Sequence, residues 1–225
     1  MLFRRMASEY DTTIRVFQPS YDDMLRFSTD FARVLAPGRL RCLDYGTGTG
    51  AALPGLLNHF DEVMAVDPQP AMLEVARARV SSQLAASAAR VSFVQGTSQS
   101  PEIASLPDAS FDAAHCSLVL MFVEGGDAKL ATLRLLHRLM RPQGVVVLTE
   151  LLAQQDDEDR FALWRALMRQ RGADAAQVAQ GEQQVHSLMH RMSADETRAL
   201  VEAAGFWGVL QVYQALHTAI FVARK

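Results

Sequence analysis

Residues 41–53 read RCLDYGTGTGAAL, and this stretch decides the fold. Its first five residues are mainly apolar and predict a buried strand, which runs into a turn with glycine at every second position. Glycine has no Cβ, so Gly46, Gly48 and Gly50 allow a tight turn and a close approach of the backbone to a ligand. Asp44 comes at the end of the predicted strand, where α/β sheets bind ligands.

A second acidic residue follows a second predicted strand. Residues 63–66 read VMAV, and Asp67 comes directly after them, about twenty residues beyond the glycine turn, where a carboxylate that binds ribose is expected. The turn reads G-x-G-x-G, whereas dinucleotide enzymes have G-x-G-x-x-G or G-x-G-x-x-A. This spacing, together with the lack of a Tyr-x-x-x-Lys motif, argues against a nicotinamide oxidoreductase.

These motifs resemble those of a known family. LDYGTGTG at 43–50, AVDP at 65–68 and the following Met72 are similar to the first two motifs of class I S-adenosylmethionine-dependent methyltransferases. The resemblance implies that the first aspartate and the glycines face the methionine part of the cofactor, that Asp67 binds the ribose hydroxyls, and that Met72 lies near the adenine. The cofactor-binding residues expected from these two motifs are Asp44, Gly46, Thr47, Gly48, Asp67, Pro68 and Met72.

The resemblance also implies the fold. We expect an α/β, Rossmann-like, seven-stranded mixed sheet of order 3-2-1-4-5-7-6, with the last strand antiparallel, helices on both faces and an N-terminal helical lid. The strands are predicted at 41–45, 63–66, 91–94, 113–120, 145–148, 206–213 and 216–222. We predict a single methyltransferase domain over 1–225, made of a helical cover (1–36), a cofactor-binding core (39–151), a helical substrate cover (152–192) and a C-terminal helix and hairpin (193–225).

The N-terminal segment is either a simple amphipathic cover or a lid over the cofactor. Methyltransferases of small molecules carry a similar Tyr-Asp, Arg, Pro, Tyr pattern, so the resemblance favours the lid and assigns Tyr10, Arg15 and Tyr21 to the cofactor site. An aromatic face stabilises a cationic sulfonium, and an arginine can pair with the carboxylate of the cofactor.

Two further segments complete the expected site. Gly96, Thr97 and Ser98 follow the third strand, where related enzymes have an acidic residue that binds the adenine amine; here Thr97 takes its place. Ser117 and Leu118, at the exit of the fourth strand, are expected to face the cofactor and the transferred methyl group. The Asn/Asp-Pro-Pro-Tyr/Phe and Pro-Cys motifs of nucleic-acid methyltransferases are absent from this point.

The segment after the fifth strand allows two interpretations. Acidic residues at 156–159 and Arg169 and Arg171 complement a helix dipole, which explains every charge without a function. Alternatively, Trp164, Leu167 and Met168 line a substrate pocket. Further on, Glu182, His186 and His190 recur at four-residue spacing on one helical face. We interpret this as a polar face, with a general base as the alternative, and expect no metal.

Composition narrows the class of protein. The chain has 225 residues, a formal net charge of −3 and 49% hydrophobic residues, and no run of about 20 apolar residues that could span a bilayer. The apolar part of residues 1–6 is too short for a secretory signal, so we expect a soluble, cytoplasmic protein. The charge gives no basic footprint for nucleic acid. Cys42 and Cys116 fall in predicted strands and are expected in the core.

The sequence therefore predicts an S-adenosylmethionine-dependent methyltransferase that acts on a small molecule by in-line transfer and releases S-adenosylhomocysteine. No catalytic base is identifiable, because transfer from a sulfonium depends mainly on positioning and exclusion of water. One alternative is an enzyme like carboxy-S-adenosylmethionine synthase of transfer-RNA modification, which Arg15, Pro19, Tyr21 and the C-terminal hairpin resemble. Another is a non-catalytic cofactor-binding subunit. The acceptor and the oligomeric state stay open.

Overall fold

The fold is built on one seven-stranded sheet. The computed structural model describes residue 7 and residues 9–225, so the expectations for residues 1–6 and Ser8 lie outside the described part. The strand order is β3-β2-β1-β4-β5-β7-β6. Strands β1 to β5 are parallel, whereas β7 is antiparallel to both of its neighbours, which confirms the predicted topology. The strands are β1 (Arg41–Tyr45), β2 (Glu62–Asp67), β3 (Val91–Gln95), β4 (Phe111–Ser117), β5 (Met140–Leu151), β6 (Trp207–Ala215) and β7 (Thr218–Arg224).

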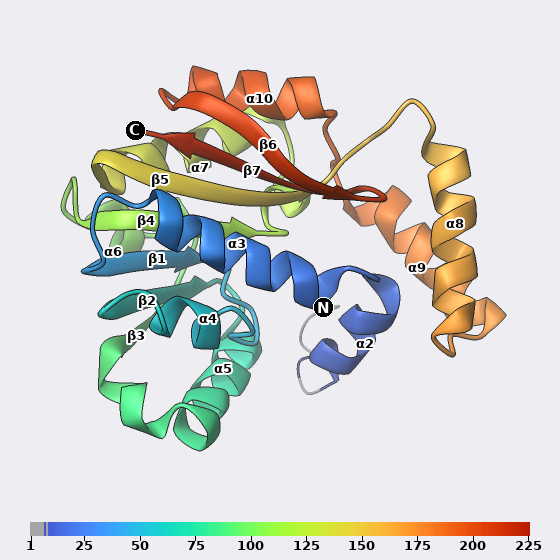
Figure 1. Ribbon diagram of the computed structural model, residues 1–225, viewed down its shortest axis with the longest axis horizontal. Coiled ribbons are helices and arrows are strands. Elements are labelled where there is room, and N and C mark those ends of the chain that lie inside the picture. Colours follow the sequence, from blue (N-terminus) through green and yellow to red (C-terminus); the bar gives the residue numbers. More distant parts are fainter. Residues whose placement is uncertain (1–6, 8) are drawn as a thin grey trace.

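Helices cover both faces of this sheet (Figure 1). One face carries α3 (Tyr21–Leu35), α4 (Leu53–Leu57) and α5 (Pro70–Gln83). The other carries α6 (Pro101–Ala104), α7 (Gly126–Leu139) and α10 (Ala194–Ala203). The remaining elements are α2 (Tyr10–Phe17), η1 (Ala85–Arg90), η2 (Leu120–Phe122), α8 (Asp157–Gln170) and α9 (Ala175–Leu188). No helix in the described ranges is long and apolar enough to cross a membrane.

Several predicted elements differ from the structure in their ends. The fifth strand, predicted at 145–148, is longer and spans Met140–Leu151. The helix expected at 51–59 is only Leu53–Leu57, because Gly50 and Leu53 donate backbone hydrogen bonds within a tight turn before the helix starts. The fourth strand begins at Phe111 and ends at Ser117, earlier than predicted at both ends. Leu118 has a φ of 57°, a left-handed conformation that ends the strand and redirects the chain toward η2.

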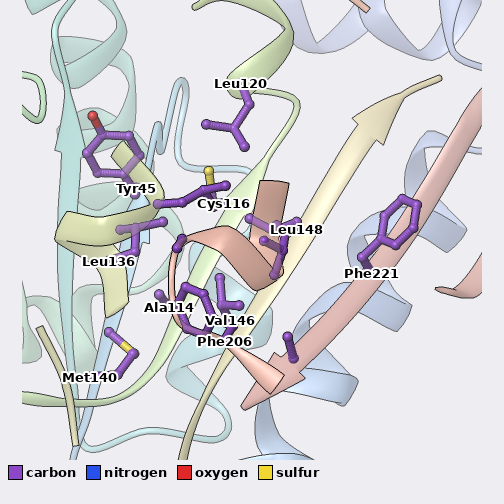
Figure 2. Close-up of a cluster of buried hydrophobic side chains, with 14 of the residues drawn as sticks. Tyr45, Ala114, Cys116, Leu120, Leu136, Met140, Val146, Leu148, Phe206 and Phe221 are labelled. Carbon is purple, nitrogen blue, oxygen red and sulfur yellow. The ribbon is translucent and has the colours of Figure 1, made fainter. Parts of the chain in front are cut away.

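The core lies on both faces of the sheet. Figure 2 shows Tyr45, Cys116, Leu136, Leu148 and Phe206 gathered in one of its clusters, where strand residues pack with side chains of α7 and of the segment after α10. Cys42 belongs to the cluster beneath α3 and α4, on the opposite face. Both cysteines are buried and free, which confirms them as core residues.

A third, smaller core holds the helices after β5 together. Helices α8 and α9 stand side by side beyond one end of the sheet (Figure 1). Phe161, Trp164 and Met168 of α8 pack against Val178 and Val185 of α9, and the side chains of Val16 and Phe17 from α2 join them. The N-terminal and post-β5 segments, far apart in sequence, therefore pack together.

Candidate functional site

The glycine turn has the conformation that its sequence predicts. Gly46, Gly48 and Gly50 have φ angles of 78°, 55° and 75°, which residues with a side chain rarely adopt. The amide of Gly48 donates to Asp67 Oδ2 at 2.9 Å. A Cβ on Gly46 would collide with the side chain of Val119, whereas a Cβ on Gly48 would meet no atom within 4 Å. The backbone at Gly48 therefore borders open space.

That open space is a cavity of about 640 Å³ above the carboxyl ends of β1, β2 and β4. It lies where ligands bind α/β sheets. All of the predicted cofactor residues except Arg15 line it. These are Tyr10, Tyr21, Asp44, Gly46, Thr47, Gly48, Asp67, Pro68, Met72, Gly96, Thr97, Ser98, Ser117 and Leu118.

Asp67 is held at the cavity wall by backbone amides. Its Oδ1 accepts from the amide of Gln69 at 2.8 Å and its Oδ2 from the amide of Gly48 at 2.9 Å. Burial raises the pKa of the Asp67 carboxyl, and these two hydrogen bonds oppose the rise. Each carboxylate oxygen keeps a second lone pair for a hydroxyl donor from a ligand.

A buried chain of polar side chains lies behind Asp44. His115 Nδ1 is 2.8 Å from Asp44 Oδ1, and His115 Nε2 is 2.9 Å from the hydroxyl of Ser28 on α3. The hydroxyl of Thr47 donates to the other oxygen of Asp44 at 2.6 Å. His115 stands in the otherwise apolar run AAHC at the edge expected to face the cofactor, but its partners Asp44 and Ser28 are too distant in the sequence to be identified from it. These hydrogen bonds fix the orientation of the Asp44 carboxylate.

Asp11, next to Tyr10 in the predicted lid, ties α2 to the glycine turn. The hydroxyl of Thr49 donates to Asp11 Oδ1 at 2.6 Å, and the guanidinium of Arg79 on α5 pairs with the other oxygen. Arg79 Nε also donates to the carbonyl of Thr49 at 3.0 Å. These contacts place Tyr10 against the cavity. The sequence showed the Tyr-Asp pair but not its partners, which are distant in the chain.

Arg15 lies elsewhere than predicted. Its Nε is 2.9 Å from Asp22 Oδ1, and its Nη1 donates to the carbonyl of Asp11 at 2.7 Å. The guanidinium also lies 5.6 Å from the centre of the Tyr21 ring. Arg15 thus holds the lid together from outside, and no lysine or arginine of the described residues lines the cavity.

The two lid tyrosines are neutral phenols. Burial, with the nearby charges of Asp11 and Asp67, raises the pKa of Tyr10 to about 12. Burial, reinforced by Tyr10 and Asp11, raises the pKa of Tyr21 as well. Both rings therefore offer an aromatic face and an O–H group, and neither acts as a base near neutral pH.

The far side of the cavity has hydroxyls where related sequences have an acid. The hydroxyl of Tyr45 accepts from the amide of Ser98 at 2.8 Å, and the Ser98 hydroxyl lies 3.0 Å from that of Thr132. Ser117 Oγ is buried and has no hydrogen-bond partner among the described residues. It is a polar atom left for a ligand.

A second cavity of about 290 Å³ adjoins the first. Tyr10, Leu118, Phe122 and Leu188 line both cavities. The rest of its wall comes mainly from α2, α8, α9 and the β6–β7 turn. Its aromatic and aliphatic residues are joined by the polar residues Thr13, Gln18, Gln177, Gln180, Gln184 and His217. Trp164 lines it as predicted, whereas Leu167 and Met168 do not. Its described lining includes no aspartate, glutamate, lysine or arginine.

The predicted polar face of Glu182, His186 and His190 is not one face. Helix α9 ends at Leu188, so His190 lies beyond it. Glu182 pairs with Arg165 at 2.7 Å, and the ring of His186 lies 4.9 Å from that of Phe161. Within the described residues, no group of three His, Cys, Asp or Glu side chains could hold a metal ion.

Comparison with known proteins finds methyltransferases and carboxy-S-adenosyl-L-methionine synthases. A family model described as a methyltransferase domain matches residues 43–148. A carboxy-S-adenosyl-L-methionine synthase of Wolinella succinogenes is 23% identical over 98% of this chain and 91% of its own length. A malonyl-[acyl-carrier protein] O-methyltransferase of Serratia marcescens is 31% identical over 67% of this chain, which spans about half (51%) of that protein. A solved structure from Thermotoga maritima, titled a possible histamine N-methyltransferase, has a TM-score of 0.64 at 18% identity, covering 99% of this chain and 98% of that one.

Proposed function

Since this chain belongs to the class I S-adenosylmethionine-dependent methyltransferases, we propose that it methylates an uncharged small molecule held in the second cavity. The observation that carries this proposal is that the two cavities meet at Tyr10, Leu118, Phe122 and Leu188. A donor in the first cavity and an acceptor in the second would approach each other there.

The residues of the first cavity fit the donor. Gly48 leaves room for a ligand against the backbone, Asp67 offers carboxylate oxygens to the ribose, and the hydroxyl of Ser117 lacks a partner. Asp44, fixed by His115, suits the ammonium group of the methionine part. Thr97 and Ser98 replace the usual acid with hydroxyls and amides on the adenine side. Arg15 is not part of this proposal, because Asp22 and the carbonyl of Asp11 bind its guanidinium.

The protein contributes to catalysis by positioning the donor and the acceptor and by excluding water. S-adenosylmethionine supplies an activated methyl group whose leaving group is a neutral thioether. The lid, held by Asp11 and Arg79, covers the junction and excludes water. The aromatic ring of Tyr10 faces a region that carries positive charge when the donor is bound. Alignment of the acceptor against the methyl group supplies the remaining rate enhancement.

A carboxy-S-adenosylmethionine synthase is the second candidate, because the relatives with that name match most of the chain. Carboxylation adds a second negative charge to a donor that already has the methionine carboxylate, and a cationic side chain would be needed to balance this added charge. The described lining of both cavities contains no lysine or arginine, and the first cavity holds Asp44 and Asp67. This charge distribution favours methyl transfer to an uncharged acceptor.

The proposal also includes a cytoplasmic location and excludes a polynucleotide acceptor and a non-catalytic role. The two free, buried cysteines suit the reducing cytoplasm. A net charge of −3 and an uncharged acceptor cavity disfavour a polynucleotide acceptor. A non-catalytic subunit does not need an open, uncharged cavity next to the donor site, so the second cavity disfavours that alternative.

The decisive experiment combines binding and turnover. Calorimetry should show donor and product cofactor binding at micromolar concentrations. A metabolite extract incubated with donor labelled in the methyl group should then yield a labelled small molecule, read by mass spectrometry. A carboxylated donor as the only new product would favour the synthase, and cofactor binding without any new product would favour the non-catalytic subunit.

A further inference from the structure

The buried end of the second cavity has one unusual group, the imidazole of His217 in the β6–β7 turn. His217 is 3% exposed and lines the cavity. Its ring lies 4.4 Å from that of Phe161, which in turn packs edge-on against Trp164 at 5.8 Å. The histidine is therefore a buried polar group in an aromatic corner.

The surroundings of His217 determine its tautomer. Nε2 lies 3.3 Å from Asp157 Oδ1 without making a hydrogen bond of good geometry, and the negative charge of the carboxylate favours a proton on Nε2. Nδ1 has no hydrogen-bond partner among the described residues. Burial lowers the pKa of His217, and Arg191 and Arg160 add to this effect against Asp157 and Asp156. The ring is therefore neutral at pH 7, with Nδ1 as a hydrogen-bond acceptor.

Two other buried polar groups at this end already make hydrogen bonds. The indole N–H of Trp164 donates to the carbonyl of Phe17. The amide of Gln18 donates to the hydroxyls of Ser20 and Thr218. Gln177 and Gln180 are exposed and lie at the rim. Thr13 and Gln184 also line the cavity, but they are half-buried, whereas His217 is 3% exposed. A ligand that reaches the buried end thus meets aromatic walls and the imidazole of His217.

From this arrangement, and resting on the proposed function, we propose the class of acceptor. The second cavity binds a flat, uncharged, mainly apolar ring compound that donates one N–H or O–H hydrogen bond to His217 Nδ1. A cavity of about 290 Å³ is at the lower end of small-molecule sites and suits a compound of about two fused rings. A charged group is excluded, because no described residue of the wall would pair with it.

Matched probes test the hydrogen bond to His217. Indole and 1-methylindole share one ring system, but only indole has the N–H donor. With the protein saturated with S-adenosylhomocysteine, calorimetry should show that indole binds about three- to tenfold more tightly, the worth of one net hydrogen bond. Indole-5-carboxylate should bind at least about tenfold more weakly than indole.

Variants assign the effect to His217. His217→Phe should abolish the preference for indole and leave the affinity for 1-methylindole unchanged. His190→Phe is the control, because its side chain is exposed and outside the cavity wall, and it should keep the preference. Equal affinities for the two indoles in the wild type, a preference that survives in His217→Phe, tight binding of the carboxylate, or no binding of indole would each overturn the proposal.

Two further measurements distinguish failure of this proposal from failure of the proposed function and from misfolding of a variant. Binding of S-adenosylhomocysteine is measured first, so its absence would reject the proposed function and not the acceptor class alone. Nitrogen-15 NMR of the wild-type histidines needs no variant. It should show His217 as the neutral Nε2–H tautomer at pH 7; an Nδ1–H tautomer would overturn the assignment of Nδ1 as acceptor.

Discussion

Asp44 and His115 lie 2.8 Å apart, both almost fully buried, at the ends of neighbouring strands that are distant in the sequence. Strands β1 and β4 are adjacent in the sheet, and Asp44 is directly opposite His115 in their register. The imidazole continues to Ser28 on α3. The position of the carboxylate at the cavity therefore depends on three separate elements.

Replacing His115 with Phe should weaken donor binding. Asp44 would keep the hydroxyl of Thr47 but lose the partner of its Oδ1 and with it its fixed orientation, and a buried acceptor left without a hydrogen bond costs about 1–3 kcal/mol. Calorimetry with S-adenosylhomocysteine measures the loss. His59→Phe is the matched control, since His59 pairs with Asp30 at 3.2 Å outside the cavity wall. If both variants lost affinity equally, His115 would have only a general structural role.

Asp67→Asn should reduce donor affinity by about 1–3 kcal/mol, because a charge-assisted acceptor for the ribose hydroxyls is replaced by a neutral amide. The amide group also cannot accept from both Gly48 and Gln69, which reinforces the effect. Asp61→Asn serves as the control, because Asp61 is exposed and outside the cavity wall. Unchanged calorimetric affinity in Asp67→Asn would reject the ribose role.

Gly48→Ala should block the donor more than it destabilises the fold. The strain of a Cβ at positive φ costs about 1–2 kcal/mol, and the methyl group would point into open space. Gly208→Ala imposes similar strain, because Gly208 has a φ of 64° against 55° for Gly48 and also has no atom within 4 Å of a Cβ. We expect similar melting temperatures for the two variants, and at least about tenfold weaker donor binding for Gly48→Ala alone. Equal donor binding would place the ligand elsewhere.

Substitution of Tyr10 tests whether an aromatic ring at the junction of the cavities stabilises the sulfonium cation of the donor. Tyr10→Leu should weaken binding of S-adenosylmethionine by about 0.5–2 kcal/mol more than binding of S-adenosylhomocysteine, because only the former is a sulfonium cation. Tyr10→Phe keeps the ring and should keep the difference between the two ligands. Comparable losses for both ligands in Tyr10→Leu would indicate packing and not a cation–π contact.

Glu150 makes stability depend on pH. Burial raises the pKa of this carboxyl from 4.5 to about 8, against the opposing effects of Lys129 and of the amides of Leu120 and Met121. Since the folded state favours the protonated form, its stabilising contribution is complete below the unfolded pKa and is lost as pH rises through about 8. Glu150→Gln should therefore gain in melting temperature relative to wild type between about pH 5 and pH 9. A difference that stays constant over this range would contradict the raised pKa.

Much of the donor site follows from local sequence. The glycine spacing at 46–50 requires positive φ angles, and an acid directly after the second strand must lie at the same sheet edge as the turn, because β1 and β2 are parallel neighbours. The order of the strands, which the resemblance to the family implied, was confirmed. Element ends were less accurate, as at Leu118, where one left-handed residue ends β4.

The sequence by itself determined the strand–turn–helix that begins the fold, the positions of Gly48 and Asp67, and the core location of both cysteines, because these depend on backbone geometry and burial over a few residues. Only the tertiary structure decided that His115 fixes Asp44, that Asp22 binds Arg15, and that His217 closes a second cavity. Those contacts join side chains whose distance is set by sheet order and helix packing, and long polar side chains such as Arg15 reach several partners that the sequence does not rank.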